Sequence, residues 1–192
     1  VLSRIVNEDI PAKHSYMPNS GYSFTREAVA KKVSIIQETE LDFNSIVMTC
    51  GAGGGLNAVL KSILSPGDKV LVSAPYFMEF RFYVDNHGGK LEVLQPKENL
   101  ELDPQAFEEA LDENVAAVIV NSPNNPSGKI YPEKNLKELC DVLKKASERT
   151  GRDIYLLMDE SYRKIVYDGV VVPPVFPLYK NTIIVGSWSK SM

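Results

Sequence analysis

Five segments rich in glycine, proline or polar residues each follow a run of apolar residues. The segments are GAGGG (51–55), APYF (74–77), NSPNNPSG (121–128), MDESY (158–162) and GSWSK (186–190). The apolar runs before them are typical of buried strands, and ligands of open α/β sheets bind at the carboxyl ends of strands. A structural protein has no need of such residues after each strand, so we expect the five segments to form one ligand site.

The glycine-rich segment 51–55 joins an expected strand to an expected helix. Free backbone N–H groups and the positive end of that helix would face a bound anion, which favours a phosphate site. Two familiar phosphate motifs fail, because the dinucleotide pattern needs glycine at Leu56 and the P-loop needs Gly-Lys at Leu56 and Asn57. A tight turn without a ligand is the alternative interpretation.

Two ionisable side chains follow buried strands. Lys190 lies in the segment Ser-Trp-Ser-Lys, where desolvation would lower its pKa and make the amine a nucleophile toward carbonyls. Asp159 directly follows an apolar run, so its carboxylate needs a cationic partner such as the ring nitrogen of a heterocyclic cofactor. Tyr162, three residues on, would bring its hydroxyl to the same pocket. An ordinary surface lysine and a helix cap are the structural alternatives.

Other polar and aromatic residues of these segments are candidates with weaker signals. Asn125 precedes a proline, where its amide would be a fixed donor, although a turn explains the same residues. Ser187 and Ser189 would add hydroxyl donors for an anion. Phe77 is an aromatic ring at a strand end, a position that core packing also explains.

Short β-branched runs alternate with helical patterns along the chain. The expected strands are 45–50, 69–74, 90–95, 116–121, 154–158 and 182–186, and the expected helices are 25–36, 56–64, 103–111 and 132–151. Nearly continuous apolar strands alternating with helices predict an α/β fold, a mostly parallel sheet covered by helices on both faces. We expect one three-layer α/β/α domain.

The composition narrows the class of protein. The 192 residues are 44% hydrophobic and 24% charged, with a net charge of -4, which fits a soluble globular domain and argues against a nucleic-acid or membrane-surface partner. The longest apolar run is too short for a membrane helix, and no signal peptide is visible at the start. Cys50 and Cys140 form no zinc or disulfide pattern, and no metal site is expected. A cytoplasmic location is the default.

Taken together and in this order, the motifs resemble the class I/II pyridoxal-phosphate aminotransferases of fold type I, the group that includes aspartate aminotransferase. The most specific parts are Asn-Asn-Pro-Ser-Gly (124–128), Asp-Glu-Ser-Tyr (159–162) and Ser-Trp-Ser-Lys (187–190). The segment from His14 to Ala28 also resembles the part of the family that precedes the sheet. The resemblance runs over nearly the whole chain and implies a PLP-transferase-like large domain with pyridoxal 5'-phosphate as cofactor.

The resemblance implies a role for each candidate residue. Lys190 would hold the cofactor aldehyde as an internal aldimine and then move a proton between Cα and C4′. Asp159 would keep the pyridine nitrogen protonated, Asn125 and Tyr162 would hydrogen-bond the phenolic oxygen, and Phe77 would stack on the ring. The phosphate would be held by Ala52, Gly53 and Ser187, with Gly54 and Ser189 as further candidates, and by Tyr16 from a neighbouring subunit. Ala74-Pro75 and Asn125-Pro126 are candidates for cis peptides.

The family also has parts that we do not find in residues 1–192. These are a phosphate-binding arginine beyond the lysine and a C-terminal small domain whose arginine binds the substrate carboxylate. We therefore expect residues 1–192 to be a large cofactor-binding domain truncated at both ends. The apolar residues Val1, Leu2, Ile5 and Val6 have the spacing of a helix, and no N-cap residue precedes them. By itself this domain should bind the cofactor weakly and lack activity, whereas the full-length parent should be a homodimer.

The implied reaction is transamination between an amino acid and a 2-oxo acid. A β-lyase or a decarboxylase of the same fold type would keep the cofactor and change the reaction. A pyridoxal-phosphate-binding sensor domain of a transcription regulator is the alternative outside catalysis. Aspartate is the favoured substrate, and Tyr22, Arg81 and His87 are the residues we consider for a place near the pocket.

Overall fold

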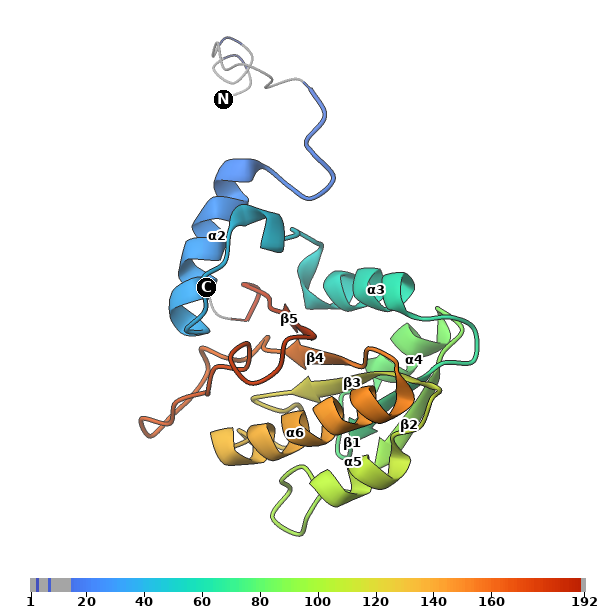
Figure 1. Ribbon diagram of the computed structural model, residues 1–192. Helices are drawn as coiled ribbons and strands as arrows, with labels where there is room; N and C mark the ends of the chain where they lie inside the picture. Colours follow the sequence, from blue (N-terminus) through green and yellow to red (C-terminus); the bar gives the residue numbers. More distant parts are fainter. Residues whose placement is uncertain (1–2, 4–6, 8–14, 191–192) are drawn as a thin grey trace.

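The computed structural model describes residues 3, 7 and 15–190, and the helical spacing expected at positions 1–6 lies almost wholly outside them. Its centre is a five-stranded sheet with the order β2-β1-β3-β4-β5 (Figure 1). All four strand pairs are parallel. The strands are β1 (Lys69–Ser73), β2 (Lys90–Leu94), β3 (Val115–Asn121), β4 (Tyr155–Asp159) and β5 (Thr182–Val185).

Helices cover both faces of this sheet. They are α3 (Gly51–Ile63) and α4 (Glu79–Asp85) on one face, and α5 (Pro104–Ala110) and α6 (Glu133–Thr150) on the other. Alternate residues of one strand supply the two cores, because successive side chains of a strand point to opposite faces. Val118 and Val120 of β3 pack with α5 and α6, whereas Ala117 and Ile119 pack with α3 and α4. The predicted three-layer α/β/α fold is therefore confirmed.

The order of the strands places a crevice at one edge of the sheet. After β1 the chain passes through α4 to β2, and then crosses the other face through α5 to reach β3, on the far side of β1. From β3 the chain continues through α6 to β4, away from β1, so the connections that leave the carboxyl ends of β1 and β3 run in opposite directions. A gap between such connections is where open α/β sheets bind ligands.

Local signals in the sequence explain where several helices begin and end. The Asp103 side chain caps α5 by accepting a hydrogen bond from the Gln105 backbone N–H at 3.2 Å, and Pro104 is the first helical residue. Gly151 ends α6 in the left-handed region, with φ of 68°, a conformation that favours glycine. These boundaries agree with the sequence prediction.

The prediction of a strand at 45–50 is wrong. Phe43–Ser45 forms the 3-10 helix η1, and residues 46–49 are extended without a partner strand. Met48 donates its N–H to the Ser20 carbonyl oxygen at 3.0 Å, and Val47 is 63% exposed. The apolar run therefore has no buried place beside the sheet. Two helices also differ from expectation: α3 begins at Gly51, within the glycine segment, and α4 was not predicted.

Helix α2 (Ser23–Ile36) lies outside the three layers, next to η1 (Figure 1). The Arg26 guanidinium donates to the Phe43 carbonyl oxygen at 3.1 Å and lies over the Phe43 ring, 4.9 Å from its centre. At its carboxyl end α2 continues into Gln37, a fully buried residue that contacts the segment after β4. This contact ties α2 to the edge of the sheet that carries the site.

Candidate functional site

A cavity of about 400 Å³ lies at the carboxyl ends of the strands. Segments far apart in the sequence line it: the start of α3, the segment from Phe77 into α4, and the segments that follow β3, β4 and β5. The predicted residues that line it are Ala52, Gly53, Phe77, Asn125, Asp159, Tyr162, Ser187, Ser189 and Lys190. The structure therefore brings together most of the predicted site.

Two predicted site residues lie outside the lining of this cavity. Gly54 faces Cys50 and Thr49, since a Cβ added to it would meet their side chains at 3.5 and 3.9 Å. Tyr16 is fully exposed. Its expected role concerns a neighbouring subunit, so this role stays a prediction.

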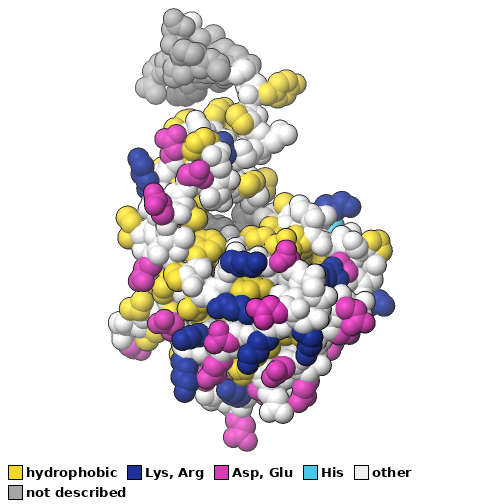
Figure 2. Space-filling view, in the orientation of Figure 1, with side chains coloured by type: hydrophobic (Ala, Val, Ile, Leu, Met, Phe, Trp, Pro, Cys, Tyr) yellow, Lys and Arg dark blue, Asp and Glu magenta, His cyan; other side chains and the backbone are white. Residues whose placement is uncertain are grey.

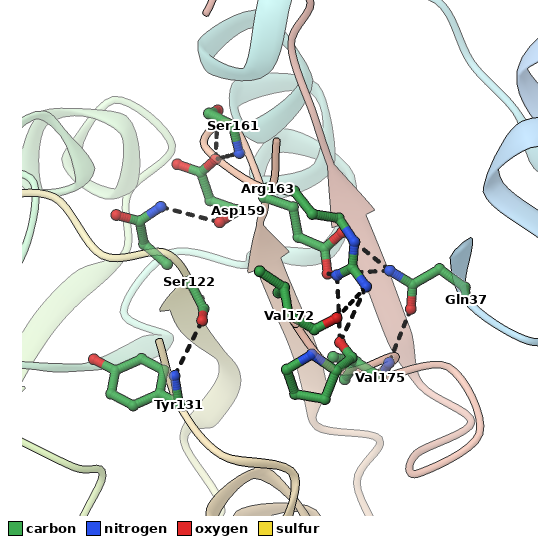
Figure 3. Close-up of polar contacts among 11 residues, drawn as sticks. Gln37, Ser122, Tyr131, Asp159, Ser161, Arg163, Val172 and Val175 are labelled. Atoms are coloured by element: carbon green, nitrogen blue, oxygen red, sulfur yellow. Dashed lines mark hydrogen bonds and ion pairs between the residues drawn. The ribbon is translucent and has the colours of Figure 1, made fainter. Parts of the chain in front are cut away.

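Asp159 ends β4 as a buried carboxylate. Its Oδ1 accepts hydrogen bonds from the Ser161 backbone N–H at 3.0 Å and the Ser161 hydroxyl at 2.6 Å (Figure 3). Burial raises the pKa of Asp159, and the two hydrogen bonds from Ser161 oppose this shift. Within residues 15–190, none of the ion pairs includes Asp159. The cavity thus contains a desolvated acid that a cationic ligand would stabilise.

Asn121 connects the ends of β3 and β4 and positions Asn125. Its Nδ2 donates to the Asp159 carbonyl oxygen at 3.0 Å, and its Oδ1 accepts from the Asn125 backbone N–H at 2.6 Å. The Ala74-Pro75 and Asn125-Pro126 peptides are cis, as predicted. A third cis peptide, Ser122-Pro123, was not predicted.

The start of α3 faces the segment after β5. The first N–H groups of a helix have no acceptor within the helix. The Gly51 N–H donates to the Thr49 carbonyl oxygen at 2.9 Å, so the N–H groups of Ala52 and Gly53 are the ones available to a ligand. A Cβ on Gly51 would lie 3.9 Å from the Ser187 hydroxyl, which itself shares a 2.7 Å hydrogen bond with the Ser189 hydroxyl. Backbone donors and two hydroxyl groups therefore converge on one end of the cavity, as an anion requires.

The glycine at position 55 has a packing role rather than a binding role. A Cβ there would meet the Thr49 hydroxyl and Val185 of β5, both at 3.3 Å. A side chain there would make contacts tighter than ordinary van der Waals contact, so Gly55 lets α3 pack closely against β5. The glycine segment thus serves both helix packing and the cavity.

A buried network supports the residue next to Asp159. Glu160 accepts from the Arg163 guanidinium at 2.7 Å and from Gln37 Nε2 at 3.0 and 3.1 Å (Figure 3). Arg163 also donates to the Val172 carbonyl oxygen at 2.7 Å, and Gln37 Oε1 accepts from the Val175 backbone N–H at 2.8 Å. Burial raises the pKa of Glu160, and the charge of Arg163 opposes this shift. This network holds the chain that leaves β4.

Sequence reasoning missed several cavity residues. They are Gly51, Leu56, Glu79, Phe80, Tyr83, Asn121 and Ser161. Asn121 could have been found, because it is the last residue of an expected strand. Glu79, Phe80 and Tyr83 lie on α4, a seven-residue helix whose length gives little periodic signal.

The three residues considered for substrate contact lie outside the cavity. Tyr22 stacks on Phe24, with ring centres 5.4 Å apart. The His87 Nε2 and Asn57 Oδ1 atoms are 3.2 Å apart, which gives His87 a structural partner. Arg81 lines a separate hollow beside β2. The geometry gives none of them a place in the site.

Three other features of the described residues bear on function, namely surface charge, membrane-spanning helices and metal-binding clusters. Figure 2 shows basic and acidic side chains interspersed over the face it presents. Among residues 15–190, no helix is long and apolar enough to cross a membrane. No cluster of three or more His, Cys, Asp or Glu residues in the described part of the chain could hold a metal ion.

The chain belongs to the class I and II aminotransferases, since the family model described as "Aminotransferase class I and II" matches residues 3–192. It is 34% identical to a probable aspartate/prephenate aminotransferase of Thermus aquaticus, over 93% of this chain and 46% of that protein. It is 31% identical to a probable N-acetyl-LL-diaminopimelate aminotransferase of Bacillus subtilis, over 92% of this chain and 44% of that protein. The chain therefore spans about half the length of the curated relatives it matches.

Solved structures show the same likeness. An amino transferase from Eubacterium rectale is 36% identical and superposes with a TM-score of 0.92, over 99% of this chain and 48% of that one. Aspartate aminotransferase from Thermus thermophilus with maleate is 29% identical, with a TM-score of 0.81, over 90% of this chain and 44% of that one. The fold is thus that of the aminotransferases.

Membership of this family implies pyridoxal 5'-phosphate as cofactor, and the cavity residues fit that group. The buried Asp159 carboxylate matches a protonated ring nitrogen, and the start of α3 with Ser187 matches a phosphate. Lys190 contributes an amine to the same cavity. The chemistry of the donors therefore agrees with the family.

Proposed function

We propose that the whole protein to which this chain belongs is a pyridoxal-phosphate-dependent transaminase that moves an amino group between an amino acid and a 2-oxo acid. The observation that carries the proposal is that the amine of Lys190 and the buried carboxylate of Asp159 line one cavity. This pairing supports the proposal because the reaction needs both groups around the same small molecule. We infer further that the protein is a cytoplasmic homodimer.

When bound, pyridoxal phosphate supplies an aldehyde that condenses with amines and a ring that withdraws electrons from the substrate Cα. Lys190 supplies the nucleophilic amine of this chain and carries the proton at the substrate Cα. Asp159 holds a proton on the ring nitrogen, because its own desolvation makes a cationic neighbour favourable. Asn125 and Tyr162 would donate hydrogen bonds to the ring oxygen, and Phe77 would pack on the ring.

The phosphate end of the cofactor is held by the start of α3. Ala52 and Gly53 offer backbone N–H groups, and the Ser187 hydroxyl lies beside them. Ser189 hydrogen-bonds Ser187 at 2.7 Å and orients it or adds a second hydroxyl. Tyr16 reaches the phosphate of a partner subunit in this proposal, which fits its complete exposure here.

The favoured amino donor is aspartate, because several of the relatives carry aspartate in their names. The groups that bind the substrate carboxylates are expected in the C-terminal part of the family fold. We therefore propose that the 192 residues are the truncated large domain and are inactive alone.

The proposal is tested with the whole protein, including any residues beyond this chain. The protein is mixed with pyridoxal phosphate, reduced with borohydride and digested, and we expect one stoichiometric label on Lys190. Aspartate with 2-oxoglutarate should then give an aminated product and a 2-oxo acid. The variant Lys190→Ala should lose the label and the transfer.

Other results would contradict the proposal in distinct ways. No label on Lys190 of the intact protein would overturn the role of this residue. Ammonia with pyruvate, or carbon dioxide, in place of a new amino acid would indicate a β-lyase or a decarboxylase. Binding of the cofactor without turnover of any amino acid would favour a sensor.

A further inference from the structure

Tyr83 occupies the space that a side chain at position 53 would fill. A Cβ built on Gly53 would lie 2.9 Å from the Tyr83 hydroxyl oxygen and 3.5 Å from its Cζ. Gly53 is in the first turn of α3, and Tyr83 reaches it from α4. A hydroxyl from a different helix therefore lies beside the backbone donors of the proposed phosphate site.

The hydrogen of this hydroxyl is directed by Glu79. Tyr83 donates a hydrogen bond to the Glu79 carboxylate one helical turn away, and both side chains line the cavity. This hydrogen bond, together with burial, raises the pKa of Tyr83 to about 12, so the phenol stays a donor at neutral pH. Glu79 is exposed, which leaves its carboxylate free to turn toward water.

We propose that Tyr83 is an additional phosphate-contacting residue of the cofactor site, and that Glu79 accepts its hydrogen bond when no anion is bound. The proposal rests on the proposed function, because it needs a phosphorylated ligand in the cavity. A phosphate oxygen at the start of α3 competes with Glu79 for the same phenolic hydrogen. Hydrogen bonds to charged oxygen groups are the strong ones, and a bound phosphate carries more negative charge than the carboxylate it would replace as acceptor.

The carboxylate of Glu79 gives the pair a second effect. A negative charge one hydrogen bond away from the phosphate contact disfavours the anion. Glu79 therefore weakens phosphate binding, while Tyr83 strengthens it. Neither residue should affect a ligand that lacks the phosphate, and this difference separates a binding role from a structural one.

The experiment compares pyridoxal phosphate with pyridoxal, using the cofactor-free whole protein and equilibrium dialysis. Tyr83→Phe keeps the ring and removes the hydroxyl. We expect it to raise the Kd for pyridoxal phosphate about tenfold, in line with the loss of a hydrogen bond to a charged group, and to leave the Kd for pyridoxal unchanged. Tyr155→Phe, at the amino end of β4, is the matched control and should change neither value.

Glu79→Gln provides a second variant that keeps Tyr83 in place. We expect it to lower the Kd for pyridoxal phosphate about threefold, the size of a screened charge effect, with no change for pyridoxal. Equal changes for both ligands, or no change for either in Tyr83→Phe, would overturn the proposal. Suppose that the unmodified protein binds pyridoxal phosphate and is labelled on Lys190, while the variants show the same ratio of the Kd values for pyridoxal phosphate and pyridoxal as the wild type. In that case only this inference fails. If it binds neither ligand, the proposed function fails as well.

Discussion

The side chain of Asn121 holds the backbone of Asp159, because its Nδ2 donates a 3.0 Å hydrogen bond to the Asp159 carbonyl oxygen. The two residues are register partners at the ends of β3 and β4. The Ser122 backbone N–H donates to the same oxygen at 3.1 Å. The position of the buried acid is therefore fixed by the neighbouring strand before any ligand binds.

Asp159→Asn should stabilise the ligand-free chain at neutral pH by about 1 kcal/mol, which is within the usual range for a stabilising substitution. Asparagine keeps an oxygen for the Ser161 donors and removes the desolvated charge. Because burial raises the folded-state pKa of Asp159 above 3.8, the folded state keeps its proton to higher pH than the unfolded state. The free energy of unfolding of the wild type therefore falls as the pH rises from the unfolded-state pKa of Asp159 to its folded-state pKa.

The pH dependence of urea denaturation checks this prediction. The difference between Asp159→Asn and the wild type should vanish near pH 3, where both side chains are neutral, and reach its full size above the folded-state pKa. Asp85→Asn, at an exposed carboxylate, is the control and should stay within about 0.5 kcal/mol. An advantage that is constant from pH 3 to 8 would show that desolvation is not its cause.

Arg163→Ala should destabilise the chain by about 3 kcal/mol, because it leaves the buried Glu160 without its cationic partner. The carbonyl oxygens of Val172 and Pro173 lose donors as well. Lys144→Ala, in the surface pair with Asp141, should cost less than about 1 kcal/mol. Urea midpoints at pH 7 measure both, and equal losses would contradict a special role for the buried network.

Gly53→Ala should depend on residue 83. Alanine favours a helix by roughly 1 kcal/mol over glycine, but its Cβ meets the Tyr83 hydroxyl at 2.9 Å. We expect the substitution to be more favourable in the Tyr83→Phe background than in the wild type, with a coupling energy of about 0.5 to 1 kcal/mol. A double-mutant cycle by thermal or urea denaturation gives this value, and strict additivity would argue against the contact.

The two cysteines should differ in reactivity. Cys50 is exposed, whereas Cys140 is fully buried and its pKa is raised to about 12 by burial. A disulfide reagent at pH 8 should therefore modify one thiol of the folded chain quickly and the second only in denaturant. Mass spectrometry of the digested protein identifies the modified residue, and rapid labelling of Cys140 would indicate that α6 opens readily.

Strongly patterned elements were predictable from the sequence, whereas a short apolar run without neighbours was not. Residues 70–72 and 115–120 are apolar at every position, which fits strands buried on both faces, and the sheet confirms them. Residues 46–48 are apolar in the same way. Whether such a run becomes a strand depends on a free edge beside it, and that is a property of the whole fold.

The candidate site likewise contains residues that the sequence predicts and residues that it does not. Asp159 and Ser187 follow strands, so their place at one edge of the sheet follows from parallel topology. Tyr83 and Glu79 enter the cavity from the short helix α4, and only the packing of α4 against α3 brings Tyr83 to Gly53. Residues of this kind carry no local signal, because the contact joins segments thirty positions apart in the chain.

The cavity draws its lining from residues 51 to 190, and this span has a consequence for synthesis. While the ribosome is still adding the segment after β5, the nascent polypeptide has the first turn of α3 but neither Ser187 nor Lys190. The complete lining of the cavity therefore exists only after nearly all of these residues have left the exit tunnel. Early collapse of the sheet would form a hollow that still lacks Lys190 and the amine proposed for it.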